Sequence, residues 1–170
     1  MKFLTIFKIF NDLKREGVFD DFAIGGAVAV NYYTDVRDTI DIVIYVLTDD
    51  EGYSLLWQTL TSMGYRPKGQ RIDMEGTLVD MFPVSIHPIF EEALKDAKRV
   101  KVSDTWVKVF RPEYIIATKL VAFRDRDQVD IHDLFKFTNI NIPKLEDILR
   151  RYSDEKTPFL RRLQKVLGRH

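Results

Sequence analysis

The sequence predicts an α/β (α+β) protein in which helices flank a mixed β-sheet and the C-terminal part is helical. Residues 39–47 alternate with the two-residue period of a strand. Stretches with apolar residues three and four apart, typical of helices, occur on both sides of it. Strand-like runs joined by short turns indicate hairpins, so the sheet is mixed rather than purely parallel. We expect a core over residues 1–110 and a helical subdomain packed on it over residues 111–170.

The N-terminal part of the chain is expected to alternate between helices and strands. The expected elements are a helix over 2–16, a strand over 22–24, a helix over 27–33, a strand over 39–47 and a helix that begins at Asp49 or Asp50 and stops at Gly64. In the strand over 39–47 the even positions, from Ile40 to Val46, are aliphatic and should face the core. Its odd positions begin with Thr39 and Asp41, so their face starts as a polar surface.

The rest of the chain adds two hairpins and then helices. Strands over 65–72 and 77–84 are expected around a turn at 73–76, and a second hairpin joins 100–102 to 106–110. Helical patterns begin at four prolines, a residue that suits a first helical turn, namely Pro88, Pro112, Pro143 and Pro158. The helix from Pro112 should extend to about Arg124, and a charged segment over 124–130 should connect it to a helix over 131–137.

The composition limits the class of protein. The 170 residues carry 26 basic and 26 acidic side chains, so no overall field favours nucleic acid or a membrane surface. The absence of cysteine excludes disulfides, thiolate metal sites and a cysteine nucleophile. No apolar run approaches the ~20 residues of a membrane span, and Lys8 interrupts the apolar N-terminus. We therefore expect a cytoplasmic protein that does not contact the membrane.

Gly25 and Gly26, between a strand and a helix, form the first candidate site. Glycines at such a turn let backbone N–H groups approach a phosphate at the positive end of the helix dipole. A tight turn that only permits close packing is the alternative.

Two aspartates are candidate metal ligands. A metal-dependent phosphoryl transferase holds Mg²⁺ with carboxylates at same-face positions i and i+2. The residue two positions after Asp41 is Val43, which has no ligand atom, and Asp38 points to the other face. Asp80 supplies a second carboxylate if its strand is a neighbour of the strand that carries Asp41. Otherwise Asp80 is a satisfied polar residue at a strand edge.

A cluster of charged residues follows in the C-terminal part, namely Lys119, Arg124, Arg126, Asp127, Asp130 and Asp133. Lys119 lies among apolar residues, so its ammonium either reaches outward or meets a buried anion. We expect Lys119, Phe123 and Arg126 on one helical face, and Asp130 and Asp133 together on the next helix. The alternative to a functional site is a set of interhelical ion pairs, Lys119 and Arg126 with Asp130 and Asp133.

Together these residues resemble the nucleotidyltransferase superfamily, which has the polymerase-β-like fold, and within it the minimal branch of AbiEii-type toxins and their relatives. The resemblance lies in the segments IGGAVAVNYY (24–33), RDTIDIVI (37–44), VDMF (79–82) and VFRPEYIIATKLVAFRDRDQVDIHDL (109–134). The last segment is the most specific, because a Pro-Glu helix start, a lysine, one or two arginines and an Asp-x-x-Asp occur in the family's order and spacing.

The resemblance implies a site for a nucleoside triphosphate (NTP) and Mg²⁺. It assigns nucleotide and phosphate binding to Gly25, Gly26, Arg37, Thr39, Lys119, Arg124, Arg126 and Asp130. It assigns metal binding to Asp41 and Asp80, and catalysis to Asp41, Asp80, Lys119 and Asp133. The implied reaction moves a nucleotidyl group from the NTP to a hydroxyl of RNA, such as tRNA, or of a protein. An antitoxin partner is a further expectation from the toxin branch.

One residue departs from the family pattern. The paired motif resembles Asp-x-Asp, whereas this chain has Asp41-Ile42-Val43. Loss of a carboxylate that bridges two metal ions costs on the order of 10³-fold or more in rate. Two hypotheses follow: an active nucleotidyltransferase with a depleted metal site, and a catalytically degenerate member that binds a nucleotide, RNA or a protein.

Overall fold

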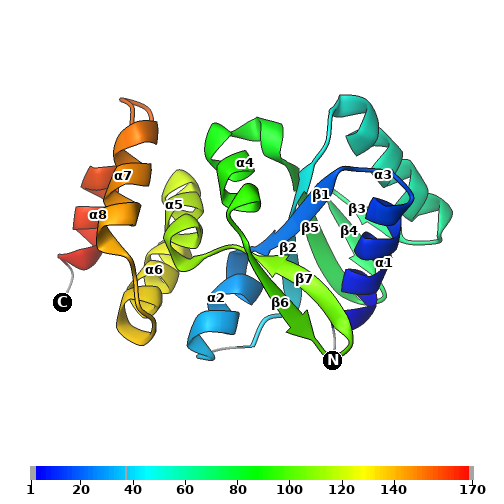
Figure 1. Ribbon diagram of the computed structural model, residues 1–170, viewed down its shortest axis with the longest axis horizontal. Helices are drawn as coiled ribbons and strands as arrows, with labels where there is room; N and C mark the ends of the chain where they lie inside the picture. Colours follow the sequence, from blue (N-terminus) through cyan, green and yellow to red (C-terminus); the bar gives the residue numbers. More distant parts are fainter. Residues whose placement is uncertain (1–2, 37, 169–170) are drawn as a thin grey trace.

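The computed structural model describes residues 3–36 and 38–168. A mixed seven-stranded sheet with the order β3-β4-β5-β2-β1-β7-β6 forms its centre. Helices α1 and α3 lie on one side of the sheet, and α2, α4 and the C-terminal helices lie on the other (Figure 1). The predicted fold class, a mixed sheet flanked by helices with a helical C-terminal part, is confirmed.

The elements have the following bounds. The strands are β1 (Asp21–Gly25), β2 (Asp41–Leu47), β3 (Arg66–Lys68), β4 (Arg71–Met74), β5 (Thr77–Pro83), β6 (Lys98–Val102) and β7 (Thr105–Val109). The helices are α1 (Leu4–Arg15), α2 (Gly26–Thr34), α3 (Asp50–Ser62), α4 (Pro88–Lys95), α5 (Pro112–Ala122), α6 (Asp125–Phe137), α7 (Ile142–Tyr152) and α8 (Phe159–Leu167), with a short 3₁₀ turn at Val84–Ile86.

The core forms where the apolar stripes of the helices meet the sheet. On α1 the buried residues Ile6, Phe7, Phe10 and Leu13 recur at helical spacing. The Phe10 ring lies 5.5 Å from that of Phe22 on β1, centroid to centroid. On β2 the aliphatic residues at positions 42, 44 and 46 are fully buried, as the alternation predicted. The opposite face of β2 is directed toward α2 and the C-terminal helices.

Some predicted strand boundaries are wrong. Ile40 precedes β2 and is 65% exposed, because the alternating pattern extends beyond the point where strand pairing begins. The single strand predicted over 65–72 is two short strands, β3 and β4, joined at Gly69, whose φ of +63° turns the chain back. Tyr65 lies outside both strands.

The charged segment over 124–130 is also helical rather than a connection. Helix α5 ends at Ala122, Phe123 adopts a left-handed φ of 51°, and α6 begins at Asp125. Acidic residues in the first turn of α6 suit the positive end of its dipole. The predicted stacking of Lys119, Phe123 and Arg126 on one helical face is therefore wrong, because two helices carry these residues.

All regular structure after Pro112 is helical within the described residues, and these helices pack against α2 and α4. Glu92 on α4 accepts two hydrogen bonds from the Arg151 guanidinium on α7, at 2.6 and 3.0 Å, and one each from the hydroxyls of Tyr114 and Tyr152. Arg162 on α8 donates to the carbonyl of Leu120 near the end of α5. Whether the helices form a separate subdomain stays a prediction.

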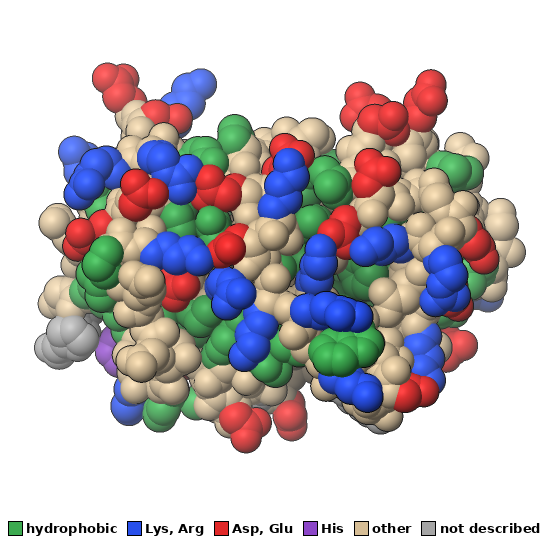
Figure 2. All heavy atoms as spheres, in the orientation of Figure 1, with side chains coloured by type: hydrophobic (Ala, Val, Ile, Leu, Met, Phe, Trp, Pro, Cys, Tyr) green, Lys and Arg blue, Asp and Glu red, His purple; other side chains and the backbone are tan. Residues whose placement is uncertain are grey.

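The surface agrees with the balanced composition. Acidic and basic side chains are interspersed over the face shown in Figure 2, with apolar side chains between them. Within residues 3–36 and 38–168, no helix is both long enough and apolar enough to cross a membrane.

Candidate functional site

Four residues form a row across four neighbouring strands. Strand β2 pairs in parallel with β5, so Val43 lies opposite Asp80. Strand β1 pairs with β2 and sets Gly25 opposite Val43, and β4 pairs with β5 and sets Arg71 opposite Asp80. Directly paired residues project to the same face of a sheet. The row Arg71, Asp80, Val43, Gly25 therefore faces the side that carries α2 and the C-terminal helices.

The two glycines are required by packing at the start of α2. A Cβ atom on Gly25 would lie 2.5 Å from the Tyr45 ring, and one on Gly26 would lie 2.6 Å from Cγ2 of Val43. Gly26 also has a φ of +60°, which other residues rarely adopt. The predicted tight turn is thus present, and Val43 fills the space directly beside it. The same turn presents the free N–H groups of the first turn of α2.

The carboxylates of Asp41 and Asp80 converge on one guanidinium. Arg71 Nε lies 3.1 Å from Asp80 Oδ1, and Arg71 Nη1 lies 3.7 Å from Asp41 Oδ2. Asp41 and Asp80 are two positions apart in the β2–β5 register and share a face. The other oxygen of Asp41, Oδ1, is buried and has no hydrogen-bond partner among the described residues. An unpartnered carboxylate oxygen in this position suits a cation.

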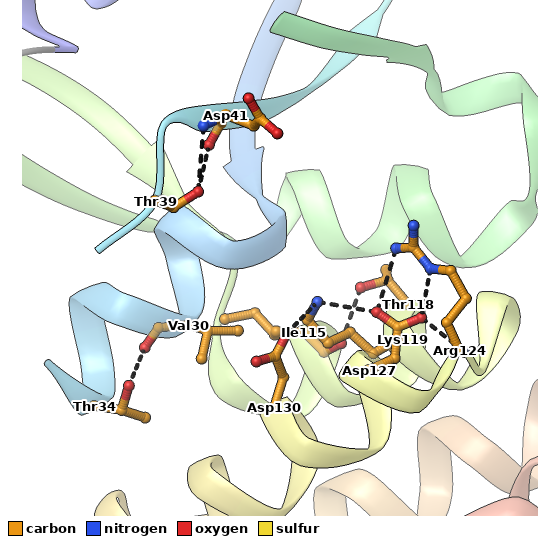
Figure 3. A network of polar contacts seen from close by, with 10 residues as sticks. All are labelled: Val30, Thr34, Thr39, Asp41, Ile115, Thr118, Lys119, Arg124, Asp127 and Asp130. Carbon is orange, nitrogen blue, oxygen red and sulfur yellow. Dashed lines mark hydrogen bonds and ion pairs between the residues drawn. The ribbon is translucent and has the colours of Figure 1, made fainter. Parts of the chain in front are cut away.

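Lys119 is held in a buried group of ion pairs (Figure 3). Its Nζ lies 2.8 Å from Asp130 Oδ2 and 3.3 Å from Asp127 Oδ1, and the three side chains are at most 8% exposed. Burial lowers the pKa of Lys119, and the charge of Asp127 acts against that effect. Burial alone would raise the pKa of Asp127, but hydrogen bonds from Arg124 and the charge of Lys119 leave that pKa below its usual value.

A pocket of about 370 Å³ lies in front of the row of strands. Its charged lining residues are Arg71, Asp80, Lys119, Arg124, Arg126 and Asp127, and Gly26 and Val43 also line it. Its apolar lining residues include Tyr45, Phe82, Ile86 and Phe90. Pockets that bind small organic ligands have volumes of about 300–1,000 Å³. A lining with both charged and aromatic side chains suits the phosphates and the base of a nucleotide.

The structure brings five of the eleven predicted site residues to the pocket lining, namely Gly26, Asp80, Lys119, Arg124 and Arg126. Gly25 lies opposite Val43 and Asp41 lies 3.7 Å from Arg71, but neither lines the pocket. The other four predicted residues are placed as follows. Thr39 braces the start of β2, because its hydroxyl donates to the Asp41 carbonyl at 3.1 Å and accepts from the Asp41 N–H at 3.3 Å. Asp130 is buried behind Lys119. Asp133, half-buried on α6, is neither a pocket residue nor within ion-pair distance of Lys119. Arg37 lies outside the described residues.

Sequence reasoning missed two residues of the site. The sequence places Asp127 in the charged cluster without a role. In the structure Asp127 and Asp130, three residues apart on α6, together form the ion pairs with Lys119. Of the interhelical ion pairs predicted as the alternative, the structure therefore contains the one between Lys119 and Asp130. Arg71 gave no signal, because its position depends on the pairing of β4 with β5.

The residues present fit one divalent cation rather than two. Mg²⁺ in nucleotide sites is commonly held by one or two carboxylates, with phosphate oxygens and water as its other ligands. Asp41 and Asp80 supply that number, and the buried Asp41 Oδ1 lacks a partner within the described part of the chain. Within residues 3–36 and 38–168, no group of three or more His, Asp or Glu side chains is arranged so that it could hold a metal ion. A second ion would require a ligand where Val43 stands.

No protein-family model matches this sequence, and no curated protein resembles it in sequence. Solved structures do resemble the fold. A nucleotidyltransferase-like protein from Paracoccidioides brasiliensis superposes with a TM-score of 0.54 at 17% identity, over 96% of this chain and 84% of that chain. The enzyme ANT(2″)-Ia, solved in complex with adenylyl-2″-tobramycin, gives 0.54 at 14% identity, over 94% and 99%. The Megavirus polyadenylate synthase gives 0.51 at 16% identity, over 78% and 31%.

These neighbours share the nucleotidyltransferase fold, and the fold that the sequence predicted is confirmed. The narrower assignment to the AbiEii-type branch stays a prediction.

Proposed function

We propose that this nucleotidyltransferase-fold protein binds an NTP, together with one divalent cation, in the pocket between Gly26 and Asp80. The observation that carries the proposal is the convergence of Asp41 and Asp80 on one face, with a buried Asp41 oxygen that has no partner in the described residues. Two carboxylates beside a glycine turn and a helix N-terminus match the two parts of a metal-bound triphosphate, its cation and its anion.

Different groups of the chain bind the different parts of the nucleotide. The first-turn N–H groups of α2 and the exposed guanidinium of Arg126 attract phosphate oxygens. The aromatic residues that line the pocket, Tyr45, Phe82 and Phe90, cover a nucleobase by stacking and remove apolar surface from water. The ion on Asp41 and Asp80 supplies neutralisation of the triphosphate when it is bound.

Binding without rapid chemistry is the form of this proposal that the residues favour. Val43 occupies the position between Gly25 and Asp80 in the row and packs against Gly26. It provides neither a ligand for a second ion nor a base. The Lys119 ammonium is already paired with Asp127 and Asp130. The role that the family resemblance gives to Lys119, neutralisation of phosphate, would therefore compete with two buried carboxylates.

The experiment for binding is a thermal-shift titration. Each of ATP, GTP, CTP and UTP is added with Mg²⁺ to the native protein and to Asp80→Asn, because a ligand of the folded state must raise the melting temperature. Asp50→Asn, on α3 at the opposite side of the sheet, is the matched control. We expect a shift in the native and control proteins that is reduced in Asp80→Asn. No shift with any nucleotide contradicts the proposal.

Nucleotidyl transfer to a hydroxyl of RNA or protein is the second candidate. The same-face placement of Asp41 and Asp80 favours it, because two carboxylates on one face supply ligands for the metal ion that such a reaction uses. Incorporation of labelled NTP into bulk tRNA, compared among native protein, Val43→Asp and Asp41→Ala, separates the two functions. Incorporation by the native protein that Asp41→Ala abolishes selects transfer. No incorporation by the native protein, with a gain in Val43→Asp, selects binding alone.

A further inference from the structure

Arg71 occupies the position of a cation between the two candidate metal ligands. It comes from β4, and the β4–β5 pairing sets it directly opposite Asp80. Its guanidinium lies within ion-pair distance of both carboxylates, at 3.1 Å from Asp80 and 3.7 Å from Asp41. Two carboxylates side by side repel each other unless a positive charge lies between them. In the absence of a metal ion, Arg71 is that charge.

We propose that Arg71 is a built-in counter-ion that must release Asp41 and Asp80 before a divalent cation binds them, and that the released guanidinium then binds the triphosphate. This inference rests on the proposed function, since it concerns the same site. It adds an order of events, in which one side chain first competes with the metal ion and then assists the nucleotide.

The contacts of Arg71 are suited to such an exchange. The 3.7 Å separation from Asp41 is an ion pair without a hydrogen bond, and the Arg71 side chain is 37% exposed. Ion pairs between partly exposed groups contribute little to stability, so they are exchanged at low cost. A divalent cation has twice the charge of the guanidinium and takes carboxylate oxygens as ligands. Arg71 also lines the pocket, so its guanidinium stays next to any bound phosphate after release.

Two binding measurements test the proposal, because they should change in opposite directions. The first is the affinity for Mn²⁺ without nucleotide, followed by electron paramagnetic resonance of the free ion. Arg71→Met should bind Mn²⁺ about tenfold more tightly than the native protein, since the competing cation is gone. Arg66→Met, on the neighbouring strand β3 and fully on the surface, is the control and should not differ from native.

The second measurement is the affinity for ATP at saturating Mg²⁺, by isothermal titration calorimetry. Here Arg71→Met should bind about tenfold more weakly, because the guanidinium that contacts phosphate is lost. A residue that only stabilises the fold would not improve one affinity and impair the other. Arg71→Lys, which keeps the charge but has no planar fork, should restore the native Mn²⁺ affinity and serves as the conservative variant if Arg71→Met does not fold.

The outcomes separate this inference from the proposed function. A native protein that binds no nucleotide contradicts the proposed function. If the native protein binds ATP but Arg71→Met binds Mn²⁺ no more tightly than the native protein does, Arg71 is not a competing counter-ion. ATP affinity that is unchanged or tighter in Arg71→Met overturns its role in holding the triphosphate.

Discussion

Replacement of Gly26 by alanine tests the geometry on which the pocket depends. Gly26 has a φ of +60°, and a left-handed conformation costs an alanine about 1–2 kcal/mol. The added Cβ would also lie 2.6 Å from Cγ2 and 2.9 Å from Cβ of Val43, so the valine must move. Overpacking of this kind costs about 1–3 kcal/mol. Gly26→Ala should therefore lower the free energy of unfolding by about 3 kcal/mol.

Urea denaturation followed by tryptophan fluorescence measures this loss, and the chain supplies a matched control. Gly69 has a φ of +63°, and a Cβ there would meet no atom within 4 Å, so Gly69→Ala reports the backbone cost alone. In a Val43→Ala background the 2.6 Å contact with Cγ2 is lost and only the 2.9 Å contact with the Cβ of residue 43 remains, so the cost of Gly26→Ala should fall by about 1–2 kcal/mol. Equal costs for the two glycines, or no coupling between positions 26 and 43, would refute the close approach of Val43 to the turn.

Two further predictions concern charged groups away from the turn. Lys119→Met leaves the carboxylates of Asp127 and Asp130 buried without their shared cation and should lower the free energy of unfolding, measured by urea denaturation, by about 3–5 kcal/mol. Lys136→Met, at an exposed position, is the control. An equal loss of stability in the two variants would be inconsistent with the buried ion pairs. Hydrogen bonds from Arg151 lower the pKa of Glu92 below 4.5, so its charge stabilises the fold above that pH. The difference in the free energy of unfolding between native protein and Glu92→Gln should become smaller as the pH falls below 4.5. A difference that stays constant on acidification would show that Glu92 does not titrate as described.

Local sequence patterns predict the elements of this fold because each pattern has a local cause. The alternation over 39–47 reflects the pleat of β2. Prolines at 88, 112 and 143 are the first or second residues of helices, because the N–H that proline lacks is not needed there. Asp49 caps α3 by accepting a hydrogen bond from the Gly52 N–H at 2.7 Å. The convergence of Asp41 with Asp80 was predicted on the condition that β2 and β5 are neighbours, and they are.

The rest of the site depends on pairing that a single sequence does not encode in a local pattern. The position of Arg71 follows from the turn at Gly69, which splits one predicted strand into two and pairs β4 with β5. Asp127 was overlooked because a segment rich in both charges was interpreted as a connection. It is in fact a first helical turn, in which the Asp127 carboxylate accepts the N–H of Arg124 at 2.9 Å.

The most direct test of the account is to locate, in solution, the metal ion that binds together with the nucleotide. Trace Mn²⁺ added to protein saturated with ATP and Mg²⁺ broadens the amide signals of residues near the ion in a two-dimensional NMR spectrum. The account predicts that the amides of Gly26, Val43 and Asp80 broaden first, since Asp80 is one of the two candidate ligands and Val43 and Gly26 line the same pocket. Broadening confined to surface carboxylates remote from the row of strands, with the Gly26 amide unaffected, would contradict it.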